Sequence, residues 1–216
     1  MDSDFFENSQ GEKESNLLLF HMLLIVLPAL QPTPAAQCNC VQARTTNGWC
    51  SACRVGYVAG LKIPSLLMYD ALDAHGHAID PKRMTCTSCR KALATDGFCN
   101  DCRMGFIKRK AYLSRLTYYV AKGTVVTESD INCARCRSHL GTTGWCDDCQ
   151  RGIVGNIAHT NRFDFDSLAE EYRRLAAAVA RIKECESCAV AGLTNGRCMT
   201  CRKVFENGEA KPLPRP

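Results

Sequence analysis

Cysteine is the residue that offers most chemistry in this sequence. Three segments share the spacing C-x2-C-x9-C-x2-C, and a fourth segment opens with C-x-C instead. The four sets, which use all sixteen cysteines, are Cys38, Cys40, Cys50 and Cys53; Cys86, Cys89, Cys99 and Cys102; Cys133, Cys136, Cys146 and Cys149; and Cys185, Cys188, Cys198 and Cys201. Two close pairs joined by a short spacer are typical of four thiolates that bind one metal ion.

Four thiolates favour zinc as the metal. Zn²⁺ accepts a tetrahedron of sulfur ligands, and a shell closed by four of them is structural rather than catalytic. Each set spans too short a segment to fold without a metal or disulfides. We therefore predict about four Zn²⁺ per chain, with iron as the less favoured occupant of the same cage. A disulfide framework stays open as the alternative, because cysteines of exported proteins tend to pair.

The spacers between the cysteine pairs predict how the pairs meet. They read VQARTTNGW, RKALATDGF, RSHLGTTGW and AVAGLTNGR. Asn47-Gly48, Asp96-Gly97 and Asn195-Gly196 supply the positive φ values that a tight hairpin turn needs. We predict that each spacer folds back as a β-hairpin and places the two pairs side by side.

Residues beside the cysteines are expected to shield and neutralise the sites. Trp49, Phe98 and Trp145 precede the third cysteine of their sets, where an aromatic ring would cover the metal. Arg197 takes that place in the fourth set, which would leave its site less shielded. The arginines that directly follow a cysteine pair would offset the negative charge of the metal centre; they are Arg54, Arg90, Arg103, Arg137 and Arg202.

The elements that position these sites are short strands and helical linkers. An apolar segment after each of the first three sets predicts a further strand, in residues 54–58, 103–107 and 150–154. Three linker helices are then expected: Leu66 to His75 with Ser65 as its cap, Lys110 to Lys122, and a long helix from Asp166 or Ser167 to about Lys183.

The segment CTSCRKALATDGFCNDC resembles the short zinc-ribbon family, which includes double zinc ribbons. The similarity covers the four cysteine cores, about a third of the chain, and implies metal binding and often a docking role, without a reaction. The chain departs from the family in two ways. Arg, Gln or Ala follows the cysteine pairs where the family has Gly, and the C-x-C opening puts Cys38 in doubt as a ligand.

The predicted fold is therefore a set of small metal-stabilised α+β repeats, four tandem zinc-ribbon β-hairpin modules joined by helical linkers. The expected boundaries are 1–37 for an N-terminal leader; 38–85, 86–132 and 133–184 for three ribbons with their linkers; 185–206 for the fourth ribbon; and 207–216 for a polar tail.

The leader differs from the rest of the chain. An acidic start is followed by an apolar run from Leu17 to Leu30 and by Ala35-Ala36, which together suit a signal peptide and its cleavage site. The acidic start does not suit one, unless translation begins at Met22 instead of Met1. We expect export to a periplasm or the extracellular space. A cytoplasmic or membrane-associated location, with transient membrane contact through residues 17–30, is the alternative.

Charge and motifs exclude several functions. The formal net charge is +5, and four tetrathiolate zinc sites would lower it to about −3, so nucleic-acid binding is not expected. The sequence has no Ser/His/Asp set, paired-carboxylate motif or Gly-rich phosphate loop, so we expect no enzyme. His75 and His77 are placed at a helix end, and His139 and His159 at the surface.

The expected function is that of a non-catalytic zinc-binding protein, a scaffold or interaction module whose linker helices are available to a protein partner. Two alternatives stay open. The chain would handle metal, by storage, buffering or sensing, or it would be an exported scaffold held by disulfides.

Overall fold

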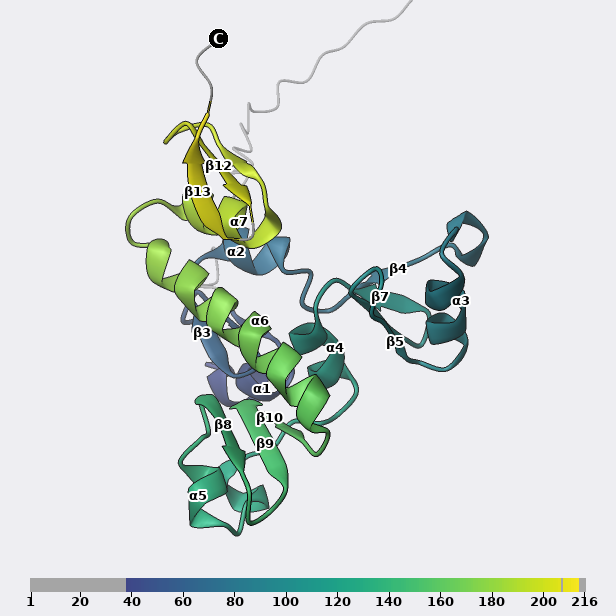
Figure 1. Ribbon diagram of the computed structural model, residues 1–216. Coiled ribbons are helices and arrows are strands. Elements are labelled where there is room, and N and C mark those ends of the chain that lie inside the picture. Colours follow the sequence, from purple (N-terminus) through teal and green to yellow (C-terminus); the bar gives the residue numbers. More distant parts are fainter. Residues whose placement is uncertain (1–37, 207, 214–216) are drawn as a thin grey trace, which may run out of the picture. The chain divides into compact units, whose positions relative to one another are not determined.

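A computed structural model describes residues 38–206 and 208–213 of the chain. These residues lie in one compact unit, Ala35–Pro216. The predicted leader, its apolar run and the residue before Cys38 lie outside the described part. Four modules follow one another along the described chain, and each begins with a short helix that leads into a three-stranded antiparallel meander (Figure 1).

The modules share one order of elements. Module 1 contains α1 (Cys40–Thr45), β1 (Trp49–Cys50), β2 (Val55–Val58) and β3 (Leu61–Ile63). Module 2 contains α3 (Thr87–Ala94), β5 (Phe98–Cys99), β6 (Met104–Ile107) and β7 (Lys110–Tyr112). Module 3 contains α5 (Ala134–Arg137), β8 (Thr142–Cys146), β9 (Arg151–Gly155) and β10 (Ile157–His159). Module 4 contains α7 (Glu186–Thr194), β11 (Arg197–Cys198), β12 (Lys203–Glu206) and β13 (Glu209–Pro212).

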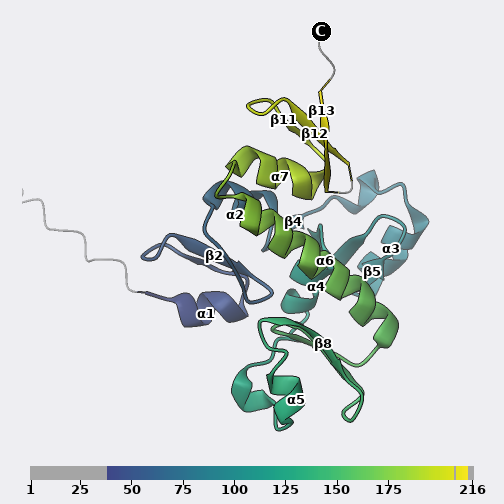
Figure 2. The same cartoon turned by 60° about the vertical axis from the view of Figure 1, so that its left-hand side comes forward.

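The segment between the two cysteine pairs is mainly helical in modules 1, 2 and 4, and in module 3 it is a turn that leads into β8, so the predicted hairpin is wrong. Figure 2 shows α1 beside β2 and α7 beside the strands of module 4. The positive φ values that suggested a turn are present, at 54° for Asn47, 49° for Asp96 and 53° for Asn195. They end the helices instead, because a left-handed residue is a common helix terminus.

The β-hairpins lie later in the chain than predicted, and their first strands end at the third cysteine of each set. The predicted strands after the fourth cysteine are confirmed as β2, β6 and β9, and each pairs with both its neighbours. The third strand of each meander was not predicted. In module 2 it replaces the start of the predicted helix from Lys110, and Lys108 and Arg109 form the turn that leads into it.

A trailing helix follows each of the first three modules. These helices are α2 (Leu66–Ala71), α4 (Arg115–Ala121) and α6 (Arg162–Arg181). The predicted cap at Ser65 is confirmed, since its side chain accepts a hydrogen bond from the Met68 N–H. Ser114 and Asn161 cap the other two helices, so α4 starts later and α6 earlier than predicted.

Short elements complete the linkers. β4 (His77–Ala78) adds a fourth strand to module 2 by pairing with β7. In module 3, Val125 forms an isolated antiparallel bridge with Ile157. The linkers also contain two 3₁₀ helices, η1 (Pro81–Arg83) and η2 (Glu128–Asp130).

In modules 1 to 3, the two faces of the sheet belong to different cores. In module 1, Trp49 pairs with Gly56 and Gly56 with Ile63, so these residues share one face. That face contributes to a large core with the trailing helices, including Tyr69, Tyr118, Phe165 and Leu168. The opposite face of each sheet forms a small separate cluster with the module's own cysteines.

Candidate metal centre

The fold brings the sixteen cysteines together in the four predicted sets. Within each set, the Sγ atoms all lie within 4.8 Å of one another. In the described part of the chain, these four are the groups that gather three or more metal-binding side chains, and each consists of thiols alone. Cys38 joins its set despite the C-x-C spacing.

Module 2 shows how the elements position the ligands. Cys86 is the N-cap of α3 and Cys89 lies in its first turn, while Cys99 ends β5. The chain then turns through Cys102 into β6, and Arg103 takes a φ of 54°. The residues at the same place in the other modules also have positive φ; they are Arg54, Gln150 and Arg202. These residues therefore adopt, without Gly, a backbone conformation that Gly adopts most readily.

The spacing of the sulfur atoms fits a bound metal. Thiolates about 2.3 Å from a tetrahedral zinc lie about 3.8 Å apart. The Sγ–Sγ distances are 3.9 Å for Cys86 and Cys99, 3.9 Å for Cys133 and Cys146, and 3.8 Å for Cys185 and Cys198. A disulfide would hold two sulfurs about 2.05 Å apart. The four thiols of each set and the distances between them therefore suit zinc. The sixteen thiols together would hold four zinc ions, each in a closed shell of four thiolates.

Backbone N–H groups donate hydrogen bonds to several of the thiols. The Cys89 N–H donates to Cys86 Sγ at 3.4 Å, the Cys102 N–H to Cys99 Sγ at 3.5 Å, and the Cys201 N–H to Cys198 Sγ at 3.4 Å. The N–H of Cys89 is the leading reason that the pKa of Cys86 is lowered to about 7, whereas burial raises the pKa of Cys89. The two thiols of this pair are therefore shifted in opposite directions.

A residue in the second strand of each meander shields the site, and the sequence analysis missed it. These residues are Tyr57, Phe106, Ile153 and Phe205, and each is buried beside the buried cysteines of its own module. The signal was available, because in a strand with alternating faces the residue after Gly56 points away from the side on which Trp49 lies.

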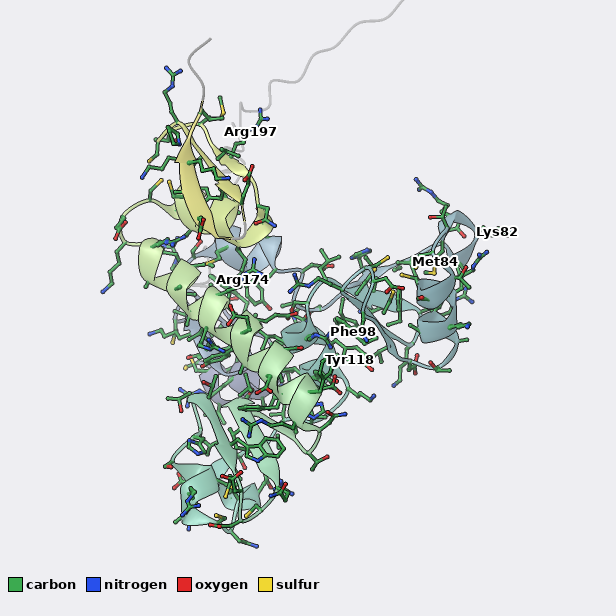
Figure 3. The ribbon with its side chains drawn as sticks, in the orientation of Figure 1. Lys82, Met84, Phe98, Tyr118, Arg174 and Arg197 are labelled. Carbon is green, nitrogen blue, oxygen red and sulfur yellow. The ribbon has the colours of Figure 1, made fainter. Side chains whose placement is uncertain are left out.

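The aromatic residues before the third cysteine do not cover the metal sites, so that prediction is wrong. They face the trailing helices, with ring centroids 5.3 Å apart for Trp49 and Tyr69, and 5.4 Å for Trp145 and Phe165. Figure 3 shows the third pair, Phe98 beside Tyr118. Arg197 is exposed on the same face of module 4, and Phe205 shields that module's site from the other face.

The arginines expected to offset the charge of the metal centres have varied surroundings. Arg103 lies 3.6 Å from Glu171 of α6, and this contact links module 2 to the long helix. Arg115, which the sequence analysis did not single out, is 8% exposed and lies 3.8 Å from Glu171 and 3.8 Å from Asp164. Arg103 and Arg115 therefore help to pack module 2 and its trailing helix against α6.

The histidines lie apart from the thiol clusters. His75 Nε2 is 3.0 Å from the Tyr69 hydroxyl, and His77 Nδ1 is 2.5 Å from Asp73. His159 is not the surface residue that was predicted: its ring packs against Tyr119 with centroids 4.6 Å apart, and burial lowers its pKa. No described group combines a histidine with the thiols.

The sequence matches no known protein-family model, and neither a curated protein nor a solved structure is significantly similar to it. In the part of the chain that the structure describes, no helix is long and apolar enough to span a membrane. The thiol clusters and the elements that they join are therefore the features that indicate a function.

Proposed function

We propose that this chain is a non-catalytic zinc-binding scaffold, whose four tetrathiolate sites hold an array of modules that binds a protein partner. One observation carries the proposal: every cluster takes two thiols from the start of a helix and two from the hairpin that follows. A metal in that position joins the two elements of a module. A shell of four thiolates also leaves no open position for a substrate or water.

The size of the module cores supports a structural role. In module 2, the cluster that contains the thiols has Phe106 as its one large buried side chain, beside Ala92 and Ala111. Such a core is too small to hold a module by itself. A structural zinc contributes on the order of 10–16 kcal/mol of apparent binding free energy. Metal release would therefore unfold the local module, which favours a scaffold over a protein that stores or buffers metal.

The exposed apolar residues at the starts of α2 and α6 are where we propose that a protein partner binds. The apolar faces of the trailing helices are buried within the array, through residues such as Tyr69, Tyr118 and Leu168. Leu66 and Leu67, at the start of α2, are instead 52% and 50% exposed, and Phe163, at the start of α6, is 72% exposed. Exposed apolar side chains of this size favour a protein surface over nucleic acid.

Stepwise chelation distinguishes the scaffold from a metal-handling protein. We expect far-UV circular dichroism and metal content to fall together as zinc is removed from the full chain, and to recover together on adding zinc. Zinc exchange with no change in the circular dichroism, or a clear preference for copper or cadmium, would favour metal handling instead. Cadmium substitution also reports the ligands directly, through thiolate charge-transfer absorption.

A pairwise binding test examines the partner surface. A partner is first captured on the wild-type chain and purified, and its affinity is then measured with Leu66→Ser/Leu67→Ser and with Phe163→Ser. We expect at least one of these variants to weaken binding while zinc content and thermal stability stay unchanged. Met199→Ser, which alters an exposed residue of module 4, is the matched control. Unchanged affinity for both test variants would count against this surface.

Export of the chain is a further part of the proposal. It rests on the apolar run from Leu17 to Leu30 and the small residues Ala35-Ala36, all outside the described residues. Mass spectrometry of the protein from its native cells would show a mature chain that begins near Gln37. An intact amino terminus at Met1 or Met22 would contradict export through a cleaved signal.

A further inference from the structure

Module 1 differs from the other modules in where its first cysteine lies. Cys86, Cys133 and Cys185 are the N-caps of their helices. In module 1 the N-cap of α1 is Asn39, so Cys38 lies outside the helix. The C-x-C spacing produces this shift, because Cys40 is already the first residue of α1.

The shift changes the environment of the thiols. Cys38 and Cys53 are both exposed, whereas the first cysteine of each other module is half-buried and only the fourth is exposed. Cys40 is half-buried, whereas the second cysteine is buried elsewhere. Cys38 and Cys53 are also close, with 3.5 Å between their Sγ atoms. Two exposed sulfurs of one cluster therefore lie side by side in module 1.

Helix capping also differs between modules 1 and 2. Cys86 Sγ accepts the Cys89 N–H as a side-chain cap of α3. Cys38 precedes its helix and is not placed to cap it in this way. The two exposed thiols, Cys38 and Cys53, are what distinguish module 1 from all the other modules.

We propose that the zinc site of module 1 is a peroxide-sensitive site, in which Cys38 and Cys53 are oxidised to a disulfide and the metal is released. This inference rests on the proposed zinc binding. One thiolate attacks the peroxide, the O–O bond breaks, and a sulfenic acid and a first water form. The second thiolate then attacks the sulfenic sulfur, which forms the S–S bond and a second water. Two protons come from solvent, two thiolates lose two electrons, and the peroxide is reduced.

Metal release from module 1 has a route to the rest of the array. The carbonyl of Arg44, in the last turn of α1, accepts a hydrogen bond from Asn156 Nδ2 of module 3 at 2.8 Å. The Asn156 N–H also donates to the Ala59 carbonyl of module 1 at 3.1 Å. Because α1 depends on the site through Cys40, oxidation of this site would loosen the contact between modules 1 and 3.

The test adds substoichiometric hydrogen peroxide to the full, zinc-loaded chain and follows zinc with a chromophoric chelator. Peptide mapping after thiol blocking identifies the disulfides. We expect the first zinc to leave severalfold faster than the rest, because only module 1 exposes two thiols of its cluster, and we expect it to leave with a Cys38–Cys53 disulfide. Equal release from all sites, or a first disulfide in modules 2 to 4, would overturn the inference.

Two reciprocal variants test the cause. Gln37→Cys/Cys38→Ser restores C-x2-C spacing in module 1 and should slow the first release to the common rate. Cys86→Ser/Thr87→Cys gives module 2 the C-x-C spacing and should create a second fast site. If the first variant fails to fold, the disulfide map of the wild-type chain and the second variant still decide. A chain purified with no zinc would refute the proposed function, whereas about four zinc ions that leave together refute this inference alone.

Discussion

The ring of Tyr118 packs against the ring of Phe98 with centroids 5.5 Å apart, and the Tyr118 hydroxyl donates to the carbonyl of Asp96 at 2.9 Å. The same arrangement recurs in module 1, where Tyr69 packs against Trp49 and donates to the carbonyl of Asn47 at 2.5 Å. A trailing helix is thus fixed both to the sheet and to the residue that ends the module's first helix. This contact attaches each of these two trailing helices to its own module.

A glycine in the second strand makes room for the trailing helix. A Cβ on Gly105 would lie 2.3 Å from Tyr118 Cδ2, which forces the ring or the helix to move. We expect Gly105→Ala to lower the free energy of unfolding by about 2 kcal/mol, as for an overpacked core, measured by urea denaturation with zinc present. Val204 holds the same place in module 4, without a trailing helix, and Val204→Ala should cost less than about 1 kcal/mol. Equal losses for both variants would contradict this account.

Substitutions of Trp49 and Arg197 test whether the aromatic residue before the third cysteine packs on a trailing helix or shields the metal. Trp49 packs on Tyr69 within the large core, whereas Arg197 is exposed. We expect Trp49→Arg to destabilise the chain by about 3 kcal/mol, and Arg197→Trp to change stability by less than about 0.5 kcal/mol. Thermal denaturation of the zinc-loaded chains provides the measurement. A gain in zinc affinity at module 4 from Arg197→Trp would show instead that an aromatic residue here shields the metal.

Module 4 presents a more polar face than module 1 at the corresponding positions. That face carries Arg197, Val204 and Lys211, which pair across the strands where module 1 has Trp49, Gly56 and Ile63.

The turn between β6 and β7 uses residues that its geometry disfavours. Lys108 and Arg109 have φ values of 47° and 64°, where Asn and Gly are preferred. We expect Arg109→Gly to raise the free energy of unfolding by about 1 kcal/mol, seen as a higher midpoint in urea. Gly208→Arg is the matched control, since Gly208 has a φ of 84° and open space around its Cβ position. That reverse change should lower stability by a similar amount.

The contact between Glu171 and module 2 predicts that Glu171→Ala and Glu171→Gln lower stability by different amounts. Glu171 accepts the Arg115 N–H at 2.9 Å, and burial raises its pKa. Glu171→Ala removes an acceptor and a counter-charge for the buried Arg115, and should cost about 2 kcal/mol. Glu171→Gln keeps an acceptor and avoids the cost of burying a charge, so it should cost less than about 1 kcal/mol. Chemical denaturation of both variants and the wild type measures the free energies of unfolding. A larger decrease for Glu171→Gln than for Glu171→Ala would contradict this prediction.

Acid should release the metal and destabilise the chain together. Backbone N–H groups of Cys89, Cys136 and Cys188 are the leading reason that the pKa values of Cys86, Cys133 and Cys185 are lowered to about 7. A lowered thiol pKa contributes stability that is present above the unfolded value and is lost as pH falls through about 7. Zinc content and thermal stability should therefore decline in parallel below about pH 7. An unchanged metal content at about pH 5 would contradict thiolate ligation.

The cysteine spacing was sufficient to predict which thiols meet, because the sixteen cysteines can be divided in few other ways into four sets with metal-ligand spacing. It was not sufficient to predict how they meet. Asn47 and Asp96 supply a positive φ, and both a hairpin turn and a helix end use that conformation. The residues before them decided the outcome: RKALA in module 2 contains helix formers, with Cys86 as a cap that sequence rules do not anticipate.

The third strands were missed for a related reason. Lys110–Tyr112 is too short to show a period, and its neighbours gave an apparent helical pattern with Leu113. In the structure Leu113 is 51% exposed and Ser114 begins the helix. Pairing with β6 determines that Lys110–Tyr112 is a strand, and this is a tertiary contact that local spacing does not encode.

The count of zinc ions and of free thiols on one sample tests the central claim most directly. The full chain is purified without added metal or reductant, and both quantities are measured before and after chelation under denaturing conditions. We predict about four zinc ions per chain, with all sixteen thiols reactive once the metal is removed under denaturing conditions. A chain with neither metal nor reactive thiols would contradict the account, because its cysteines would then be paired in disulfides.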